Sequence, residues 1–102
     1  MNKKTINIDH RELLDTIQII HIIRKLHDDR AEVNDSEYLG SIIYDILSKL
    51  HNDEDGCTIE LDTEQRFAVW LSLGQYKDFT VECNHPDENK YISNVMEKFC
   101  GL

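Results

Sequence analysis

The sequence is poor in the residues that build several common kinds of functional site. Of its 102 residues, four are glycine, three are cysteine and one is proline. Four scattered glycines cannot form a glycine-rich phosphate loop, and the Gly-x-Ser-x-Gly and His-Glu-x-x-His motifs are absent. The three cysteines lack the spacing of a disulfide framework. We therefore expect reduced thiols, no bound cofactor and no enzymatic activity.

Positive charge is also scarce. Eleven Lys and Arg residues face twenty Asp and Glu residues, which gives a net charge of −9. Such a chain is repelled by the phosphate backbone of nucleic acids and by anionic lipid, so neither is an expected direct ligand. A basic protein partner would instead be attracted. The sequence shows neither a secretory signal pattern nor the ~20 consecutive apolar residues of a membrane span, so a cytoplasmic location is expected.

Apolar residues make up much of four segments with helical spacing. The first helix is predicted to start after Asp9, where Glu12 completes a capping box, and to continue to about Ala31. Its isoleucines at 17–23 point in all directions around the helix axis, so neighbours must cover it on several sides. A strand through these isoleucines is the alternative. Residues 38–50 and 91–100 each predict an amphipathic helix with one apolar stripe.

The third helix starts a second copy of this pattern. Residues 58–62 repeat residues 5–9 at a shift of 53, and Asp62 with Gln65 again forms a capping-box pattern. This helix is also apolar nearly all round at 67–71, and Gly74 is interpreted as its end. We interpret residues 1–102 as a single domain with an internal duplication of residues 5–50 and 58–102. The alternative is that capped amphipathic helices simply resemble one another.

Short segments of alternating polar and apolar residues predict a minor β part. They lie near residues 5–8, 58–61 and 79–83. The predicted fold class is therefore mainly α: two repeated helical hairpins packed as a four-helix domain, with these short strands.

The cysteines and one histidine suggest a metal site as one reading of the chain. Cys57, Cys83, His85 and Cys100 carry three thiols and an imidazole, the donors that structural zinc uses. Their spacing matches no zinc finger, and buried free cysteine is the more common state. A small-ligand or metal-binding module is thus the alternative function.

The leading hypothesis is a small, acidic, non-catalytic protein-interaction module, whose partner is another protein or a second copy of the chain in a homodimer. Isoleucines beyond what the core needs indicate an interface, and acidic loops suit a basic partner. An inhibitor or regulator of a nucleic-acid-binding protein is one form of this hypothesis, and in size and acidity the chain is similar to small accessory proteins of phages. The predicted partner-binding residues are Ile19, Ile22, Ile23, Asp53, Glu54, Asp55, Asp87 and Glu88.

Overall fold

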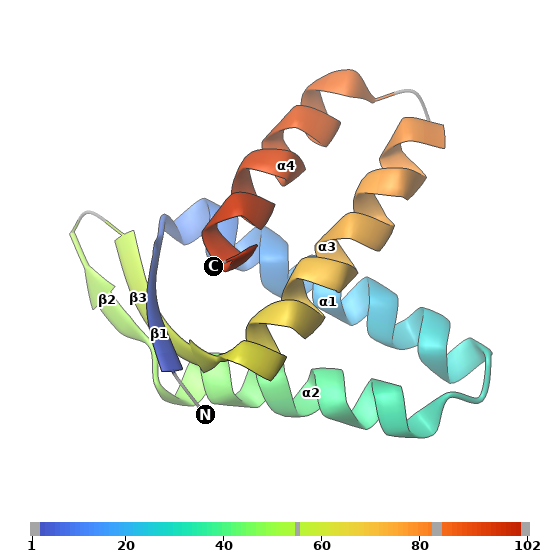
Figure 1. Cartoon of the computed structure of the whole chain (residues 1–102), viewed down its shortest axis with the longest axis horizontal. Coiled ribbons are helices and arrows are strands. Elements are labelled where there is room, and N and C mark those ends of the chain that lie inside the picture. Colours follow the sequence, from blue (N-terminus) through green and yellow to red (C-terminus); the bar gives the residue numbers. More distant parts are fainter. Residues whose placement is uncertain (1–2, 55, 83–84, 101–102) are drawn as a thin grey trace.

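The computed structural model describes residues 3–54, 56–82 and 85–100, without the side chains of residues 52, 53, 81 and 82. Over these residues the chain forms β1 (Lys3–Ile8), α1 (His10–Asp29), α2 (Val33–Ser48), β2 (His51–Asp53), β3 (Gly56–Asp62), α3 (Thr63–Glu82) and α4 (Pro86–Cys100) (Figure 1). The predicted fold class, mainly helical with a minor β part, is confirmed. None of the described helices has the length and apolar character that crossing a membrane requires.

The strands form a small antiparallel sheet in the order β1-β3-β2. Along β1, Ile6 and Ile8 are buried and their neighbours are exposed, as the two-residue period of a half-covered strand requires. Ile59 and Leu61 do the same on β3. The strands predicted near 5–8 and 58–61 are confirmed, and β2, which was not predicted, is the third strand of the sheet.

Both long helices begin with the predicted capping boxes. Asp9 accepts a hydrogen bond from the backbone N–H of Glu12 at 2.7 Å, and the Glu12 carboxylate accepts one from the N–H of Asp9 at 3.3 Å. In α3, Asp62 accepts from the N–H of Gln65 at 2.8 Å, and the Gln65 side chain accepts from the N–H of Asp62 at 3.1 Å. These bonds satisfy orphan donors in the first turn and fix where each helix starts.

Helix α1 lies in the middle of the molecule, where it contacts α2, α3 and β3 (Figure 1). Its Ile20 is fully buried, and Leu73 of α3 is 1% exposed. The helix predicted over the isoleucines is thus confirmed, and the alternative strand is excluded. The expected all-round covering is incomplete, because Ile22 on α1 is 46% exposed and Phe67 on α3 is 57% exposed.

The strand predicted at 79–83 is wrong. Residues 79–82 form the last turn of α3, and Cys83 lies outside the described residues. Thr80 is buried, with its hydroxyl donating to the carbonyl of Lys77, whereas Phe79 is 59% exposed. This is the burial of a helix that packs against α4, and it reverses the sides that an alternating strand would give. Gly74, predicted as the helix end, lies inside α3.

Helix α1 ends at Asp29 rather than near Ala31 because the chain reverses there. Ala31 has a positive φ of 59°, its N–H donates to the carbonyl of Asp28, and the N–H of Glu32 donates to the carbonyl of His27 at 2.8 Å. These two bonds and the left-handed residue make up a Schellman motif, which satisfies the last carbonyls of a helix.

The two halves of the chain share their element bounds. Adding 53 to the bounds of α1, 10–29, gives 63–82, which are the bounds of α3. In the sheet, Ile6 of β1 pairs with its own counterpart Ile59, and the pair Thr5–Glu60 maps onto the pair Asn7–Thr58. The strand pairing is therefore unchanged when each residue is replaced by its counterpart 53 positions away. Internal duplication of the chain stays a prediction, since this agreement concerns present structure and not origin.

Candidate partner-binding trough

Two adjoining grooves run along the side of α1 that the other helices leave open. The first lies between α1 and α4 with a volume of about 550 Å³, and the second lies between α1 and α3 with about 500 Å³. They share Ile22 and Tyr76. We call the two grooves together the α1 trough. The first is lined by Arg11, Asp15, Gln18, Ile19, Ile22, Tyr76, Asp87, Glu88, Tyr91 and Ile92, and the second by Ile22, Ile23, Leu26, His27, Arg30, Gln75, Tyr76, Asp78 and Phe79.

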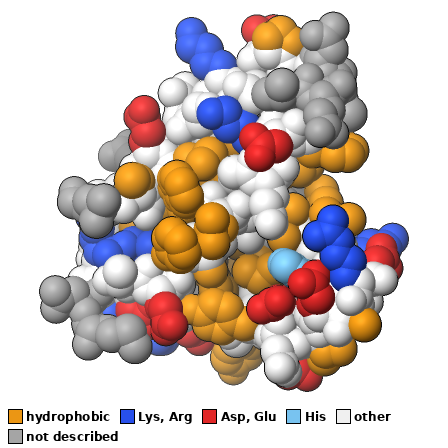
Figure 2. Space-filling view, turned by 45° about the vertical axis from the view of Figure 1, so that its right-hand side comes forward, with side chains coloured by type: hydrophobic (Ala, Val, Ile, Leu, Met, Phe, Trp, Pro, Cys, Tyr) orange, Lys and Arg blue, Asp and Glu red, His pale blue; other side chains and the backbone are white. Residues whose placement is uncertain are grey.

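Apolar side chains form much of the trough surface. Ile19 and Ile23 are buried beneath it, while Ile22, Leu26 and Phe79 are 46%, 44% and 59% exposed. Figure 2 shows one face of the molecule on which hydrophobic side chains are exposed, with Asp, Glu, Lys and Arg side chains around them. Isoleucine and phenylalanine side chains left in water at a concave surface are typical of a binding site rather than of a scattered apolar surface.

Acidic side chains at the first groove are held in place by tyrosines. The Tyr91 hydroxyl donates to Asp15 Oδ2 at 2.8 Å, and the Tyr76 hydroxyl donates to Glu88 Oε1 at 3.2 Å. Burial, followed by the hydrogen bond to Asp15, raises the pKa of Tyr91 well above its ordinary value, so the phenol stays protonated as a donor. Two of the carboxylates are therefore oriented before any partner arrives.

Arg11 partly offsets this negative charge. Its guanidinium lies 5.7 Å from the centre of the Tyr91 ring, and its Nε is 3.8 Å from Asp15 Oδ2. The Arg11 side chain is 86% exposed, so the ion pair contributes little to stability and is free to rearrange. Counted over both grooves, four carboxylates (Asp15, Asp78, Asp87, Glu88) face two guanidinium groups (Arg11, Arg30).

The structure brings together five of the eight residues predicted to bind a partner. Four of them, Ile19, Ile22, Asp87 and Glu88, line the first groove, and Ile22 with Ile23 lines the second. Ile19 and Ile23 are mostly covered by the core, so Ile22 is the isoleucine that a partner can reach. Glu54 is exposed and lines neither groove. The side chain of Asp53 and all of Asp55 lie outside the described residues.

The predicted cysteine–histidine set does not converge among the residues that the structure describes. Cys57 is buried in β3, Cys100 is exposed at the end of α4, and His85 is exposed just before α4. Cys83 lies outside the described part.

A different group has three potential ligand atoms close together within the described ranges: His27, Glu32 and Asp35. None of these three residues was selected as a ligand from the sequence. The end of α1 lies between His27 and the two acidic residues. Neither the helical nor the strand period therefore relates their positions, and neither could indicate the group.

We find no family model that matches this chain, and no curated protein or solved structure with significant similarity to it. The geometry and chemistry of the molecule itself therefore carry the functional proposal.

Proposed function

We propose that the protein is a non-catalytic interaction module that binds an amphipathic, basic helix of another protein in the α1 trough. The observation that carries the proposal is that exposed apolar side chains and oriented carboxylates occupy one concave surface. This combination of an apolar floor and a polar rim is what helix-binding grooves use.

The apolar part of the proposal rests on Ile22, Leu26 and Phe79. Ile22 and Leu26 are four residues apart on α1 and therefore lie on one side of the helix, and Phe79 faces them from α3. Covering a side chain of this kind contributes roughly 1.5–3 kcal/mol when it is fully buried. Two or three such contacts contribute roughly 3–9 kcal/mol, so the charged residues and the rest of the trough must supply what remains of the about 8 kcal/mol of a micromolar complex and of the cost of association.

Charge favours a basic occupant. The acidic residues of the trough outnumber its basic ones, and the whole chain carries −9. Complementary charge steers a basic segment toward the surface and disfavours acidic competitors. A second copy of this acidic chain would meet like charge, which is why a separate basic partner is preferred here over a homodimer.

The length of the trough suits a helix. The trough follows α1 from Arg11 to Arg30, and α1 has 20 residues, which corresponds to about 30 Å at 1.5 Å per residue. A partner helix of about five turns could lie along it. Proteins that bind nucleic acids carry such basic helices, so an inhibitor or regulator of such a protein in the cytoplasm remains the specific form of this proposal.

The test uses two synthetic helical peptides with the same leucine stripe, one with lysine and one with glutamate at all other positions. We expect the chain to bind the Leu/Lys peptide in calorimetric titration, with affinity that falls as salt rises, and to bind the Leu/Glu peptide far more weakly. Replacing two apolar contacts in the double variant Ile22→Gln/Leu26→Gln should weaken binding by about tenfold or more.

The matched control is Leu14→Gln, which changes an apolar side chain of α1 that is 56% exposed and lines neither groove. All variants are first checked for an unchanged fold by circular dichroism. Equal effects of the control and the double variant would contradict the proposal, as would affinity indifferent to salt. A concentration-dependent dimer that the double variant abolishes would instead assign the trough to a second copy.

A further inference from the structure

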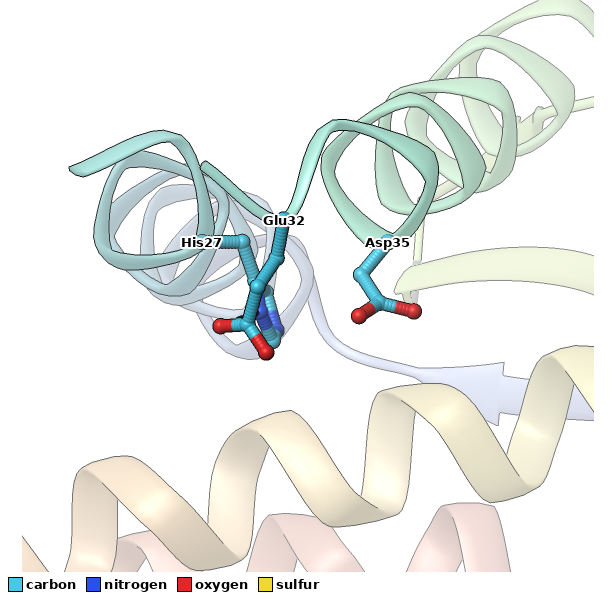
Figure 3. Close-up of side chains that lie close together, drawn as sticks. All are labelled: His27, Glu32 and Asp35. Atoms are coloured by element: carbon cyan, nitrogen blue, oxygen red, sulfur yellow. Dashed lines mark hydrogen bonds and ion pairs between the residues drawn. The ribbon is translucent and has the colours of Figure 1, made fainter. Parts of the chain in front are cut away.

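Three potential metal ligands meet where α1 passes into α2. His27 lies in the last turn of α1, Glu32 directly precedes α2 and Asp35 lies in its first turn (Figure 3). One nitrogen or oxygen of each side chain lies within 4.8 Å of those of the other two. The shortest separation joins His27 Nδ1 and Glu32 Oε1 at 3.2 Å. In Figure 3 the side chains of all three residues extend toward the same side of the junction.

The helix end itself positions two of the three ligands. The N–H of Glu32 donates to the carbonyl of His27, so the Schellman motif fixes these two residues next to each other. Glu32 is the residue before α2, but its carboxylate caps none of the N–H groups of the helix. It lies against the imidazole instead, which leaves the N-cap role unfilled by a side chain.

The distances and donor types fit a transition-metal ion. Zinc lies about 2.0–2.2 Å from histidine nitrogen and carboxylate oxygen, so neighbouring ligands of a tetrahedral site are roughly 3.3–3.5 Å apart. The separation of 3.2 Å between His27 and Glu32 is close to such an edge, and a small rotation of the Asp35 side chain would bring in the third ligand. An imidazole with two carboxylates suits zinc better than Mg²⁺ or Ca²⁺, which prefer oxygen alone.

We propose that His27, Glu32 and Asp35 form a binding site for a zinc-class divalent ion, with the fourth position filled by water. The His27 side chain is only 20% exposed, so an ion there would be partly shielded, while the Glu32 side chain, 41% exposed, leaves the site open to entry. The alternative is an ordinary His27–Glu32 hydrogen bond, which needs no third group. A third potential ligand, the carboxylate of Asp35, lies close to the same pair. Its position favours the metal site over a simple hydrogen bond.

The second half of the chain provides an internal comparison. At a shift of 53 the three positions are Thr80, His85 and Glu88, and the N–H of His85 donates to the carbonyl of Thr80 just as that of Glu32 donates to His27. This hydrogen bond is thus common to both halves. Threonine replaces the histidine, however, and Glu88 accepts a hydrogen bond from Tyr76. The ligand set belongs to the first half alone among the described residues.

The test titrates the full chain with Zn²⁺ and with Co²⁺ alone, followed by calorimetry and by the visible spectrum of cobalt. We expect one ion per chain, a cobalt spectrum without the intense absorption of thiolate ligands, and a higher melting temperature with zinc. His27→Ala should abolish the binding and the thermal shift, and Asp35→Asn should weaken binding at least about tenfold.

His21→Ala serves as the control, because it removes an exposed histidine of the same helix. The control should bind zinc like the original chain, and circular dichroism verifies that each variant is folded. Absence of binding, or binding that survives His27→Ala, would overturn the proposal. Binding that is lost in His85→Ala or after alkylation of the cysteines would also overturn it and would point to the cysteine–histidine set.

Discussion

Among the residues that the structure describes, Ala31 is the one non-glycine residue with a positive φ. It adopts φ 59° at the end of α1, where the Schellman motif usually places glycine. A side chain in this left-handed region costs roughly 1–2 kcal/mol because Cβ approaches the following carbonyl. The first half of the chain tolerates this cost in order to reverse direction and to place Glu32 beside His27.

We predict that Ala31→Gly raises the free energy of unfolding by about 1 kcal/mol, since glycine removes the strain but loses more chain entropy on folding. Urea unfolding followed by circular dichroism measures the change. The control is Ala68→Gly inside α3, which should lower stability by about 1 kcal/mol because glycine is a poor helix former. A loss of stability in Ala31→Gly would contradict the inferred strain.

A second prediction concerns Asp9 and pH. The hydrogen bond from the Glu12 backbone is the main reason that the pKa of Asp9 is lowered, against a smaller opposing effect of burial. A lowered pKa in the folded state means that the carboxylate stabilises the fold above its ordinary pKa, and that this contribution is lost as the pH falls through the lower value. Asp9→Asn keeps the cap but removes the charge. The original chain should melt at a higher temperature than this variant at pH 7, and the difference should vanish as the pH falls well below the ordinary pKa of aspartate; a constant difference would count against it.

The features of the fold that depend on a few neighbouring residues were predicted best from the sequence. The capping boxes at Asp9 and Asp62 depend on groups three residues apart, so their pattern predicts their geometry directly. The end of α1 at Asp29 was predicted two residues too late, near Ala31, because alanine favours helices and carries no stop signal. The exposure of Ile22 could not be predicted either, because it depends on which elements pack against α1 in the folded chain.

At the scale of elements, α3 shows how packing overrides local pattern. Alternation of polar and apolar residues at 79–83 indicated a strand, and Gly74 indicated a helix end, yet α3 continues through both to Glu82. Its partner α4 lies alongside and covers Thr80 on the helical period. A short alternating segment contains no information about a helix that follows it in the chain, so the packing of α4 against residues 79–82 could not be predicted from it.

Gly74 allows a prediction of its own. A Cβ added there would meet only the terminal carbon of Met96, at 3.4 Å, which is an ordinary contact. Gly74→Ala should therefore stabilise the chain by up to about 1 kcal/mol through helix propensity, measurable as a higher midpoint of urea unfolding. Gly56→Ala is the contrasting variant: its φ is +148° and its Cβ would lie 2.8 Å from the carbonyl oxygen of Ile8, so stability should fall. A destabilised Gly74→Ala would show that α3 and α4 cannot accept the methyl group.

At the scale of the whole molecule, the sequence indicated the composition of the trough but not its shape. Ile22 and the pair Asp87–Glu88 were each selected for a partner, and the fold places them on one groove although some 65 residues separate them. Tyr91 and Tyr76, which orient the carboxylates, were not selected, because tyrosines at helical spacing look like core residues. The group of His27, Glu32 and Asp35 was not predicted, because its residues come together only where the chain reverses at Ala31 between α1 and α2.

The pairing of β1 with β3 is unchanged when each residue is exchanged for its counterpart in the other half. Two identical subunits pair in this way in a symmetric dimer. A true dimer of identical halves must present every feature twice. Here the two halves differ: at a shift of 53 residues, Asp15 and Tyr91, which are hydrogen-bonded, correspond to Ala68 and Tyr38, and His27 corresponds to Thr80. Over the residues that the structure describes, the α1 trough and the group of His27, Glu32 and Asp35 each occur once, so we expect one helix and one ion to bind per chain.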